Sequence, residues 1–354
     1  MAYTTINKPT DYFNTVLYTG NDTDDHAITG VNFQPDFVWI KGRSSAVSHN
    51  LYDVIRGANK PLRSNGTNAE FTRTDALKSF DSDGFTLDDD ATSDEVNNNG
   101  VTYASWNWLA GGTASSNTDG SITSSVSANT TSGFSIVSYT SNGSASQTVG
   151  HGLGVAPNVI ISKNRTDGGA TYGNWVVYHS SLATANDKKL TLNSTAAASS
   201  TNEWGDTDPT STVYSVHTSG DGATNHSTDQ IVSYCFVEKK GFSKFGSYKG
   251  NGNTDGTFVY TGFKPAFILV KDTGSTNGWY MFDNKRSSYN GEGARLEANS
   301  NSAELTNNNF DILSNGFKNR LSGTGSNGSG NNYIYMAFAE NPLVTSGGTP
   351  ATAR

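Results

Sequence analysis

Carboxylate clusters are the first residues in this sequence that could do chemistry. Acidic side chains gather at residues 22–25, 88–90 and 94–95. Oxygen-rich loops of this kind can hold Ca²⁺, which takes about six to eight oxygen ligands. However, none of the clusters has the spaced D-x-D-x-D-G pattern with a closing glutamate that characterises a calcium loop. We therefore interpret them as solvated turns and predict no metal site.

Asp53 and Asp283 raise the question of acid–base catalysis, because a glycosidase needs two carboxyl groups across a cleft. The two residues occupy matching positions in repeated segments, whereas the corresponding position of the middle segment is His179. A catalytic acid would rarely be present in two copies out of three. The position therefore predicts a structural role, and we expect no enzymatic activity.

The histidines and the single cysteine could ligate a transition metal or act as base and nucleophile. The six histidines never have H-x-H or H-x-x-x-H spacing, the local pairs that zinc sites commonly use. Cys235 lies inside an aromatic run, where a buried and inert thiol is expected. The glycine-rich segment 323–328 lacks the Lys-Ser/Thr and the helix of a phosphate loop. The sequence thus predicts no cofactor.

Aromatic residues in polar surroundings are candidates for stacking on sugars. These candidates are Trp175, Trp204, Trp279 and Tyr289. Packing in a core is the alternative interpretation, because the sequence does not show which side chains are exposed. Other aromatics align between the repeated segments described next, and we interpret those as core.

One repeated segment indicates the elements that must position these side chains. Pro35, Pro157 and Pro265 each precede a short apolar run, and a lysine follows each proline by six residues. A second pattern, Leu-x-x-Asn-x-x-x-Ala, follows each run, and an aromatic segment comes later in each copy. The leucines are Leu62, Leu190 and Leu296, and the aromatic segments are residues 103–108, 231–236 and 333–338. Elements repeated in a constant order indicate a repeat architecture.

The repeats divide the chain into three units. We predict a first unit at residues 1–112, a second at 133–240 and a third at 241–345. Residues 113–132 are rich in Gly, Ser and Thr and form either a linker or an extra edge strand. Residues 346–354 are predicted to be a flexible tail.

The periodicity of each segment predicts strands. Phe37 and Trp39 alternate with apolar neighbours, so both faces of this strand are predicted to be buried. The segment 103–108 alternates aromatic and polar residues, which predicts one buried and one solvated face. Asn-Gly and Asp-Gly dipeptides supply tight turns at short intervals. The predicted fold is all-β, with three tandem antiparallel β-sandwich units of jelly-roll or concanavalin-like type.

Composition and charge exclude several classes of function. The net charge is −8, and no basic run is present, which argues against nucleic acid as a partner. No apolar run approaches the ~18 residues of a membrane span. The N-terminal segment lacks the basic and apolar regions of a signal peptide. One cysteine allows no intrachain disulfide, so we expect synthesis in a reducing cytosol.

Several segments resemble a known domain. Residues 2–7, 28–41, 79–85, 133–139 and 241–248 are similar to an uncharacterised repeat domain. That domain occurs in virion and tail structural proteins of marine tailed phages, where it is associated with lectin-like sandwiches. The resemblance covers nearly the whole chain. It implies no catalytic or binding residue, because none is established for the domain.

This resemblance and the absence of a catalytic pattern lead to an expected function. We expect a virion structural protein of a tailed bacteriophage, a tail-fibre or adhesin subunit that contacts host-surface polysaccharide. Its other partners would be virion proteins and further copies of itself in a trimer. A capsid-surface fibre or decoration protein is one alternative, and a polysaccharide depolymerase is a second.

Overall fold

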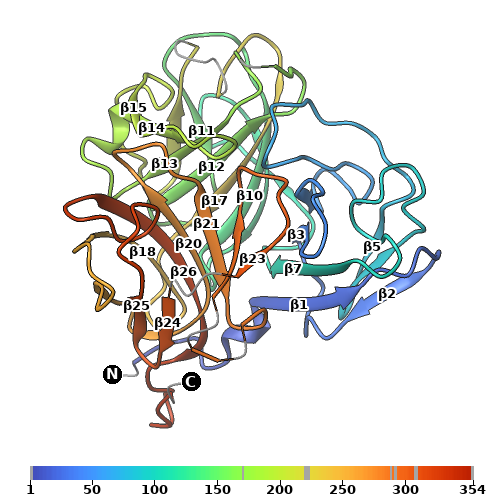
Figure 1. The fold of residues 1–354 in the computed structure, drawn as a ribbon. Coiled ribbons are helices and arrows are strands. Elements are labelled where there is room, and N and C mark those ends of the chain that lie inside the picture. Colours follow the sequence, from blue (N-terminus) through green and yellow to red (C-terminus); the bar gives the residue numbers. More distant parts are fainter. Residues whose placement is uncertain are drawn as a thin grey trace.

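The computed structural model describes residues 3–169, 171–218, 224–287, 289–290, 293–306 and 310–351. These residues form an all-β fold of antiparallel sheets, as the sequence predicts (Figure 1). Two short 3-10 helices accompany the strands: η1 (Pro9–Asp11) and η2 (Ala185–Asp187). Neither they nor any other helical stretch in the described part of the chain has the length and apolar character needed to span a bilayer.

Three large sheets correspond to the three predicted repeats. Sheet I has the order β1 (Phe13–Thr19), β7 (Thr102–Trp108), β3 (Phe37–Gly42), β4 (Asn50–Asp53). The eight strands of sheet II, in order from one edge, are β8 (Ser115–Asn117), β9 (Ser124–Asn129), β10 (Phe134–Thr140), β17 (Gln230–Phe236), β12 (Val159–Asn164), β13 (Trp175–His179), β14 (Lys188–Thr191) and β15 (Ser199–Ser200). Those of sheet III are β18 (Ser243–Lys249), β26 (Asn332–Pro342), β20 (Phe263–Asp272), β21 (Trp279–Asp283), β22 (Ala294–Glu297) and β23 (Leu305–Thr306).

Each large sheet is accompanied by a small sheet from the same repeat. The small sheets are β2 (His26–Thr29), β6 (Gly84–Leu87) and β5 (Leu77–Asp81); β11 (Gln147–Gly150) and β16 (Val213–Val216); and β19 (Phe258–Tyr260), β25 (Gly316–Asn319) and β24 (Phe310–Leu313). Buried side chains fill the space between the large and the small sheet in the first and third repeats. In these two repeats the large and the small sheet thus pack face to face as a β-sandwich.

The strand after each proline has the same register in all three large sheets. Phe37 lies opposite Trp108, Val159 opposite Phe236, and Phe267 opposite Phe338. Phe37, Val159 and Phe267 each follow the proline of their repeat by two positions. In sheet III the strand begins earlier, and Pro265 lies within β20 at an irregularity in its pairing with β26. A bulge accommodates a residue that cannot donate to the ladder.

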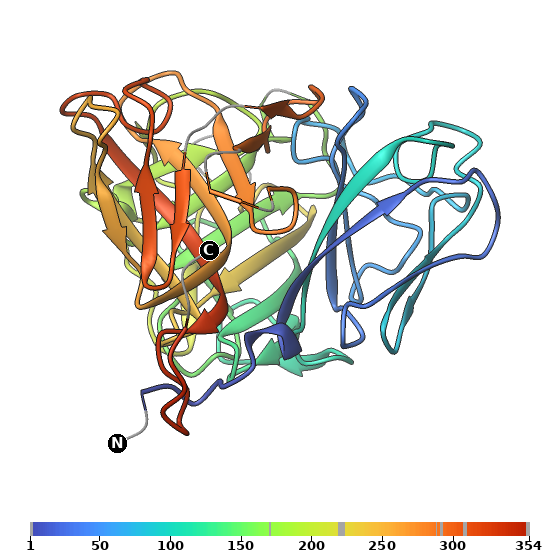
Figure 2. The same ribbon diagram turned by 60° about the horizontal axis from the view of Figure 1, so that its bottom comes forward.

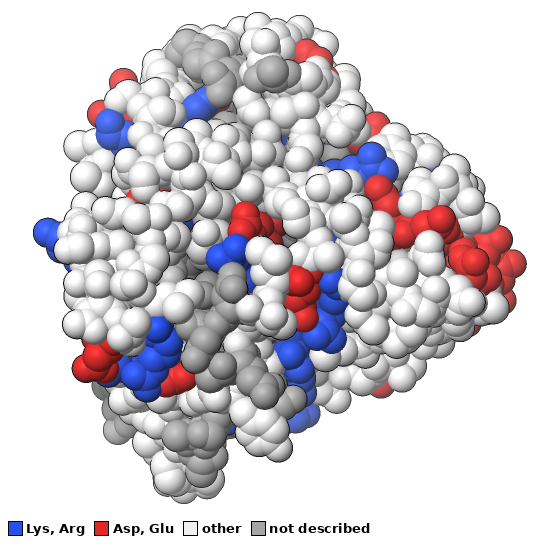
Figure 3. All heavy atoms as spheres, in the orientation of Figure 1, with Lys and Arg blue, Asp and Glu red and all other residues white. Residues whose placement is uncertain are grey.

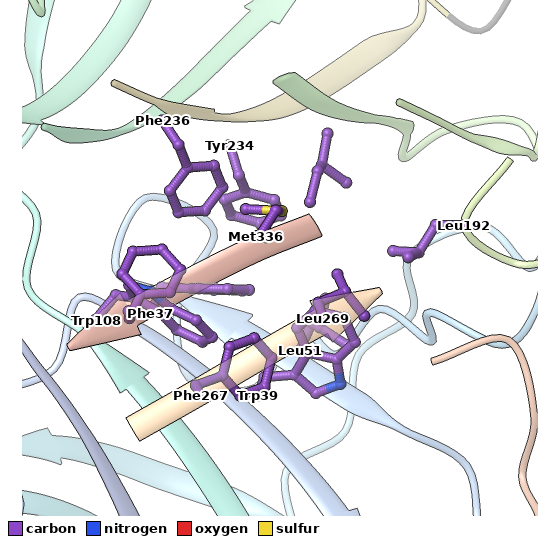
Figure 4. Close-up of a pocket in the computed structure, with 12 residues that line it drawn as sticks. Phe37, Trp39, Leu51, Trp108, Leu192, Tyr234, Phe236, Phe267, Leu269 and Met336 are labelled. Atoms are coloured by element: carbon purple, nitrogen blue, oxygen red, sulfur yellow. The ribbon is translucent and has the colours of Figure 1, made fainter. Parts of the chain in front are cut away.

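The three large sheets share one hydrophobic core instead of forming three separate sandwiches. Phe37 of sheet I stacks on Tyr234 of sheet II with ring centroids 4.3 Å apart. Phe13 of sheet I stacks on Phe338 of sheet III at 5.2 Å. Figure 2 shows the first repeat beside the other two, and Figure 4 shows aromatic side chains from all three converging. An apolar cavity of only about 20 Å³ remains among them, too small to hold an organic ligand.

The shared core corrects one expectation about the strand β7. Its polar face was predicted to be solvated, but Ser105 and Asn107 are both buried. The Asn107 side-chain amide donates to the carbonyl oxygen of Asn14 on the neighbouring strand. The second sheet of the same repeat covers this face, and the hydrogen bond to Asn14 satisfies the N–H side of the buried amide.

The two segments outside the repeats are also described. Strands β8 and β9 extend the edge of sheet II, so residues 113–132 form the predicted edge strands, not a linker. Within the predicted tail, the backbone N–H of Ser346 donates to Asn7, and Val344 pairs with Pro350. Residues 346–351 therefore form a hydrogen-bonded turn near the N-terminal segment, and 352–354 lie outside the described residues.

Candidate functional site

The matching acids Asp53 and Asp283 lie at junctions between large sheets. Asp53, which pairs with Arg56, also accepts a 2.8 Å hydrogen bond from the hydroxyl of Tyr234 on sheet II. Asp283, which pairs with Arg286, accepts a 3.0 Å bond from the indole N–H of Trp106 on sheet I. Burial opposes ionisation of Asp283, but the charge and hydrogen bonds of Arg286 hold its pKa below the usual value. Both acids are buried and paired with an arginine.

His179 occupies the same position at the third junction. Its Nε2 lies 3.2 Å from the carbonyl oxygen of Tyr335 on sheet III. Burial lowers the pKa of His179 to about 4, so the ring is neutral at physiological pH. The residue of sheet III that matches Tyr234 and Trp106 is Met336, which has no proton to donate. A carboxylate at this position would have no side-chain donor, because Met336 cannot donate a hydrogen bond. The neutral ring of His179 instead donates to the backbone carbonyl of Tyr335.

Two arginine clamps close the outer ends of two junctions. In the first clamp, Arg165 of sheet II makes paired 2.8 and 2.9 Å bonds to Glu70, which also contacts Arg56 at 3.2 Å. In the second clamp, Arg43 makes paired 2.9 and 3.0 Å bonds to Glu304, which contacts Arg286 at 3.0 Å. Paired bonds of this kind are strong and geometrically specific.

The junction between sheets II and III has no such clamp. The residues matching the three clamp positions are Leu182, Ala198 and Thr273. The backbone contact is nevertheless retained, because the N–H of Ala198 donates to the carbonyl of Thr273 at 2.9 Å, as Glu70 does to Arg165 at 2.8 Å. This junction keeps its backbone geometry while it loses its charged side chains.

The three lysines of the repeated segment are buried. The ammonium of Lys163 donates to the backbone carbonyl of Gly173 at 2.8 Å, and the ammonium of Lys271 donates to the backbone carbonyl of Asp272 at 2.6 Å. Burial lowers the pKa of Lys163 to about 7 and of Lys41 and Lys271 to about 8. A depressed lysine pKa can also mark a catalytic amine. Repetition at three matching positions, each bonded to backbone carbonyls, favours a structural role here.

The acidic clusters of the first repeat already have protein partners. Lys78 Nζ lies 2.8 Å from both Asp25 and Asp88, and buried Asp90 pairs with Arg73. Figure 3 shows acidic side chains gathered on the side of the molecule where Figure 1 places β2 and β5. Lys78 thus occupies the space between carboxylates that a cation would need.

A different acidic group was not apparent from residue spacing. Ligand atoms of Asp167, His226 and Asp229 lie within 4.8 Å of one another, and Tyr172 stacks on the His226 ring at 3.8 Å. Asp229 already accepts bonds of 2.8 Å from both His226 and Asn164. In sheet III, Asp272 matches Asn164 and Asn331 matches Asp229, so the acid and the amide are exchanged. Asn331 donates to Asp272 at 2.8 Å. This exchange indicates that the group stabilises the end of the sheet.

The four aromatic candidates lie in different environments. Trp175, Trp204 and Trp279 are buried, at 0, 2 and 2% exposed. The indole N–H of Trp175 donates to Arg63, and that of Trp279 to Thr191, both across sheet junctions at 2.9 Å. The prediction that these three tryptophans stack on sugars does not fit the structure, because their ring faces contact protein. Tyr289 is 73% exposed and stays a candidate.

The structure adds an aromatic pair that the sequence analysis missed. Phe258 and Tyr260 are 44 and 49% exposed on the edge strand β19. They lie on one side of the strand, because Val259 between them is buried. The alternation Phe-Val-Tyr was the available signal.

Two polar grooves open onto the described surface. Groove A, about 410 Å³, lies on sheet II and is lined by Ser116, Thr123, Ser124, Ser125, Ser138, Tyr139, Thr140, Arg165 and Gln230. Groove B, about 470 Å³, lies at the junction of sheets II and III and is lined by Ser181, Leu182, Ala183, Ser247, Tyr248, Lys249, Thr273, Asn332, Tyr333 and Ile334. Both have the size of sites for small organic ligands.

The two grooves share part of their framework. Ser138 pairs with Val232 as Ser247 pairs with Ile334, so β10 and β17 at groove A match β18 and β26 at groove B. Strands β8 and β9 line groove A alone, and residues 181–183 line groove B alone. Hydroxyl and amide groups dominate both linings. Such groups exchange hydrogen bonds with polyhydroxylated ligands, but they include no activated nucleophile.

The fold and these grooves define an all-β sandwich protein with two polar surface grooves. The chain belongs to the family described as Domain of unknown function (DUF7483), whose model matches residues 8–342. No curated protein and no solved structure matches the chain.

Proposed function

We propose that this chain is a non-catalytic virion structural protein of a tailed bacteriophage, an adhesin or tail-fibre subunit that contacts host-surface glycans. The observation that supports glycan contact most directly is the pair of polar grooves, one on sheet II and one at the junction of sheets II and III. Two grooves on one chain offer two contacts to one repeating polymer. Two weak contacts on one chain raise the overall affinity through effective concentration.

The state of the reactive groups supports a non-catalytic role. Asp53 and Asp283 are buried in ion pairs with arginines. Burial raises the pKa of the Cys235 thiol and lowers that of His179, which makes the first a poor nucleophile and keeps the second uncharged. Catalytic groups need access to substrate and a pKa near the working pH.

The shared core supports a structural role. Aromatic contacts such as Phe37 to Tyr234 and Phe13 to Phe338 join all three repeats into one packed body. A rigid body keeps its grooves at fixed distances from one another. The short edge strands β15 and β23 leave little backbone for uncontrolled pairing, so oligomer contacts, a trimer in our proposal, can form through side chains.

Binding of the purified chain to host cells tests this proposal. We expect saturable binding that free host polysaccharide competes away, without release of shortened chains from that polysaccharide. Labelling particles with an antibody against the chain then distinguishes tail from head. Absence of cell binding together with label on the capsid would support a decoration protein, and released oligosaccharides would support a depolymerase.

A further inference from the structure

Groove B lies at the junction of sheets II and III, the one junction without an arginine clamp among its described residues. The matching part of sheet II shows what this junction lacks. In sheet II the side chain of Arg165 starts at the end of β12 and reaches Ser138 on β10, with Nη1 3.2 Å from the serine oxygen. It therefore crosses the intervening strand β17 near Val232. The guanidinium fills the space above that strand.

The matching path in sheet III is open. It runs from Thr273 past Ile334 to Ser247, and all three residues line groove B. Threonine is too short to span it. Groove B therefore includes the space that the Arg165 side chain crosses in sheet II.

All three clamp positions differ together at this junction. Leu182 replaces an arginine, Ala198 replaces the glutamate and Thr273 replaces the second arginine, by comparison with Arg56, Glu70 and Arg165. Loss of one partner alone would leave a poorly solvated charge without its counter-ion, which is strongly destabilising. Joint replacement avoids that penalty and leaves an accessible groove.

The chemistry of the lining indicates the class of ligand. Ser181 and Ser247 supply hydroxyls, Asn332 supplies an amide, and Leu182 with Ile334 supplies an apolar floor. The Thr273 hydroxyl donates to the carbonyl of Asn332 at 3.1 Å, so it offers a ligand only its acceptor lone pairs. The hydroxyls of Tyr248 and Tyr333 donate to backbone carbonyls elsewhere, so these two residues do not supply donors to a ligand. A pyranose ring has the complementary features, with hydroxyls at its rim and C–H groups on its faces.

Lys249 gives the groove a positive charge. It is exposed, and none of the described lining residues of groove B is acidic. Within the described part of the chain, no carboxylate forms an ion pair with it. The cation of groove A, Arg165, is by contrast neutralised by Glu70. An anionic ligand therefore distinguishes groove B from groove A.

We propose that groove B binds an acidic saccharide, with the sugar carboxylate at Lys249 and the hydroxyls at Ser247, Thr273 and Asn332. This proposal rests on glycan contact as the function of the chain and names its site and specificity. Groove A is the neutral counterpart.

Calorimetry of the full chain with two oligosaccharides tests the proposal. The probes are a hexamer of a uronic acid and a neutral glucose hexamer. We expect the acidic hexamer to bind more tightly, and Lys249→Gln to weaken it by about tenfold or more, as loss of a charge-assisted contact would. Lys244→Gln removes a lysine from the same strand outside the groove and should leave binding unchanged. Ser247→Tyr fills the groove and should abolish it.

Thermal unfolding of each variant verifies that the fold is intact, since Ser247 and Lys249 are exposed. Equal affinity for both hexamers, or binding that Lys249→Gln and Ser247→Tyr do not affect, would overturn the proposal even if the chain binds host cells. Conversely, tight acidic-saccharide binding lost in Lys249→Gln would sustain the groove assignment even if host cells are not bound.

Discussion

The hydroxyl of Tyr234 donates a 2.8 Å hydrogen bond to Asp53, a residue 181 positions earlier in the chain. This contact joins sheet II to sheet I, and Trp106 to Asp283 is its counterpart between sheets I and III. At the remaining junction the donor is replaced by Met336 and the acid by His179. Donor and acceptor therefore change together, which is the expected behaviour of a side-chain pair that maintains a sheet junction.

Removing either acid should destabilise the fold strongly. Asp53→Ala removes the nearer of the two carboxylates that pair with the buried guanidinium of Arg56 and leaves Glu70 at 3.2 Å as the other. Breaking a buried ion pair costs about 3–5 kcal/mol. Asp283→Ala should have a similar effect at the other junction. Urea denaturation followed by tryptophan fluorescence measures both.

The matched control is Tyr234→Phe, which removes the donor and keeps the ion pair. We expect a smaller loss of about 1.5–3 kcal/mol, typical of a hydrogen bond to a charged group. If Asp53→Ala costs no more than Tyr234→Phe, the acid does not stabilise this junction as inferred.

The missing clamp can be rebuilt. Thr273→Arg alone places a guanidinium near Ala198 with no acid opposite, whereas Thr273→Arg with Ala198→Glu recreates the pair seen in Arg165 and Glu70. We expect the double variant to be more stable than the sum of the single effects, with a coupling of about 1–2 kcal/mol in a double-mutant cycle. Additive effects would contradict the matching of the junctions.

The repeats and the strand class could be predicted because they depend on local patterns. Proline, apolar run and lysine recur at Pro35, Pro157 and Pro265, and alternation along Phe37 and Trp39 shows that both faces are buried. Periodicity does not reveal what covers each face, however. Here the small sheet covers one face and the other two repeats cover the second.

The stacking candidates show the same limit. Trp175 and Trp279 have polar neighbours in sequence. However, the indole N–H of each donates to a backbone carbonyl of the preceding repeat, which allows the ring to be buried. His49 at the matching position contacts the carbonyl of Glu297 at 3.0 Å. The alignment of these positions was the signal that they are structural. The grooves could not be predicted from the sequence, because they depend on which side chains cross between strands.

The thiol of Cys235 should be unreactive in the native protein. The residue is 0% exposed within β17, and burial raises its pKa above the usual value. Thiol labelling with a chromogenic disulfide should be negligible in buffer and reach one thiol per chain in urea. Rapid labelling of the native chain would show that β17 is accessible from solvent.

The stability of the protein should fall as the solution is acidified, in part because of His179. Its pKa is about 4 in the folded chain and 6.5 as an unperturbed side chain, so the unfolded state takes up the proton first. The contribution is fully present above pH 6.5, is lost progressively as the pH falls, and changes no further below about 4. His179→Gln keeps an amide that can donate to Tyr335 but does not titrate. We expect the free energy of unfolding of this variant, measured in urea at several pH values, to vary less than that of the wild type between pH 6.5 and 4. A variant with the same pH dependence as the wild type would show that other groups account for the acid sensitivity.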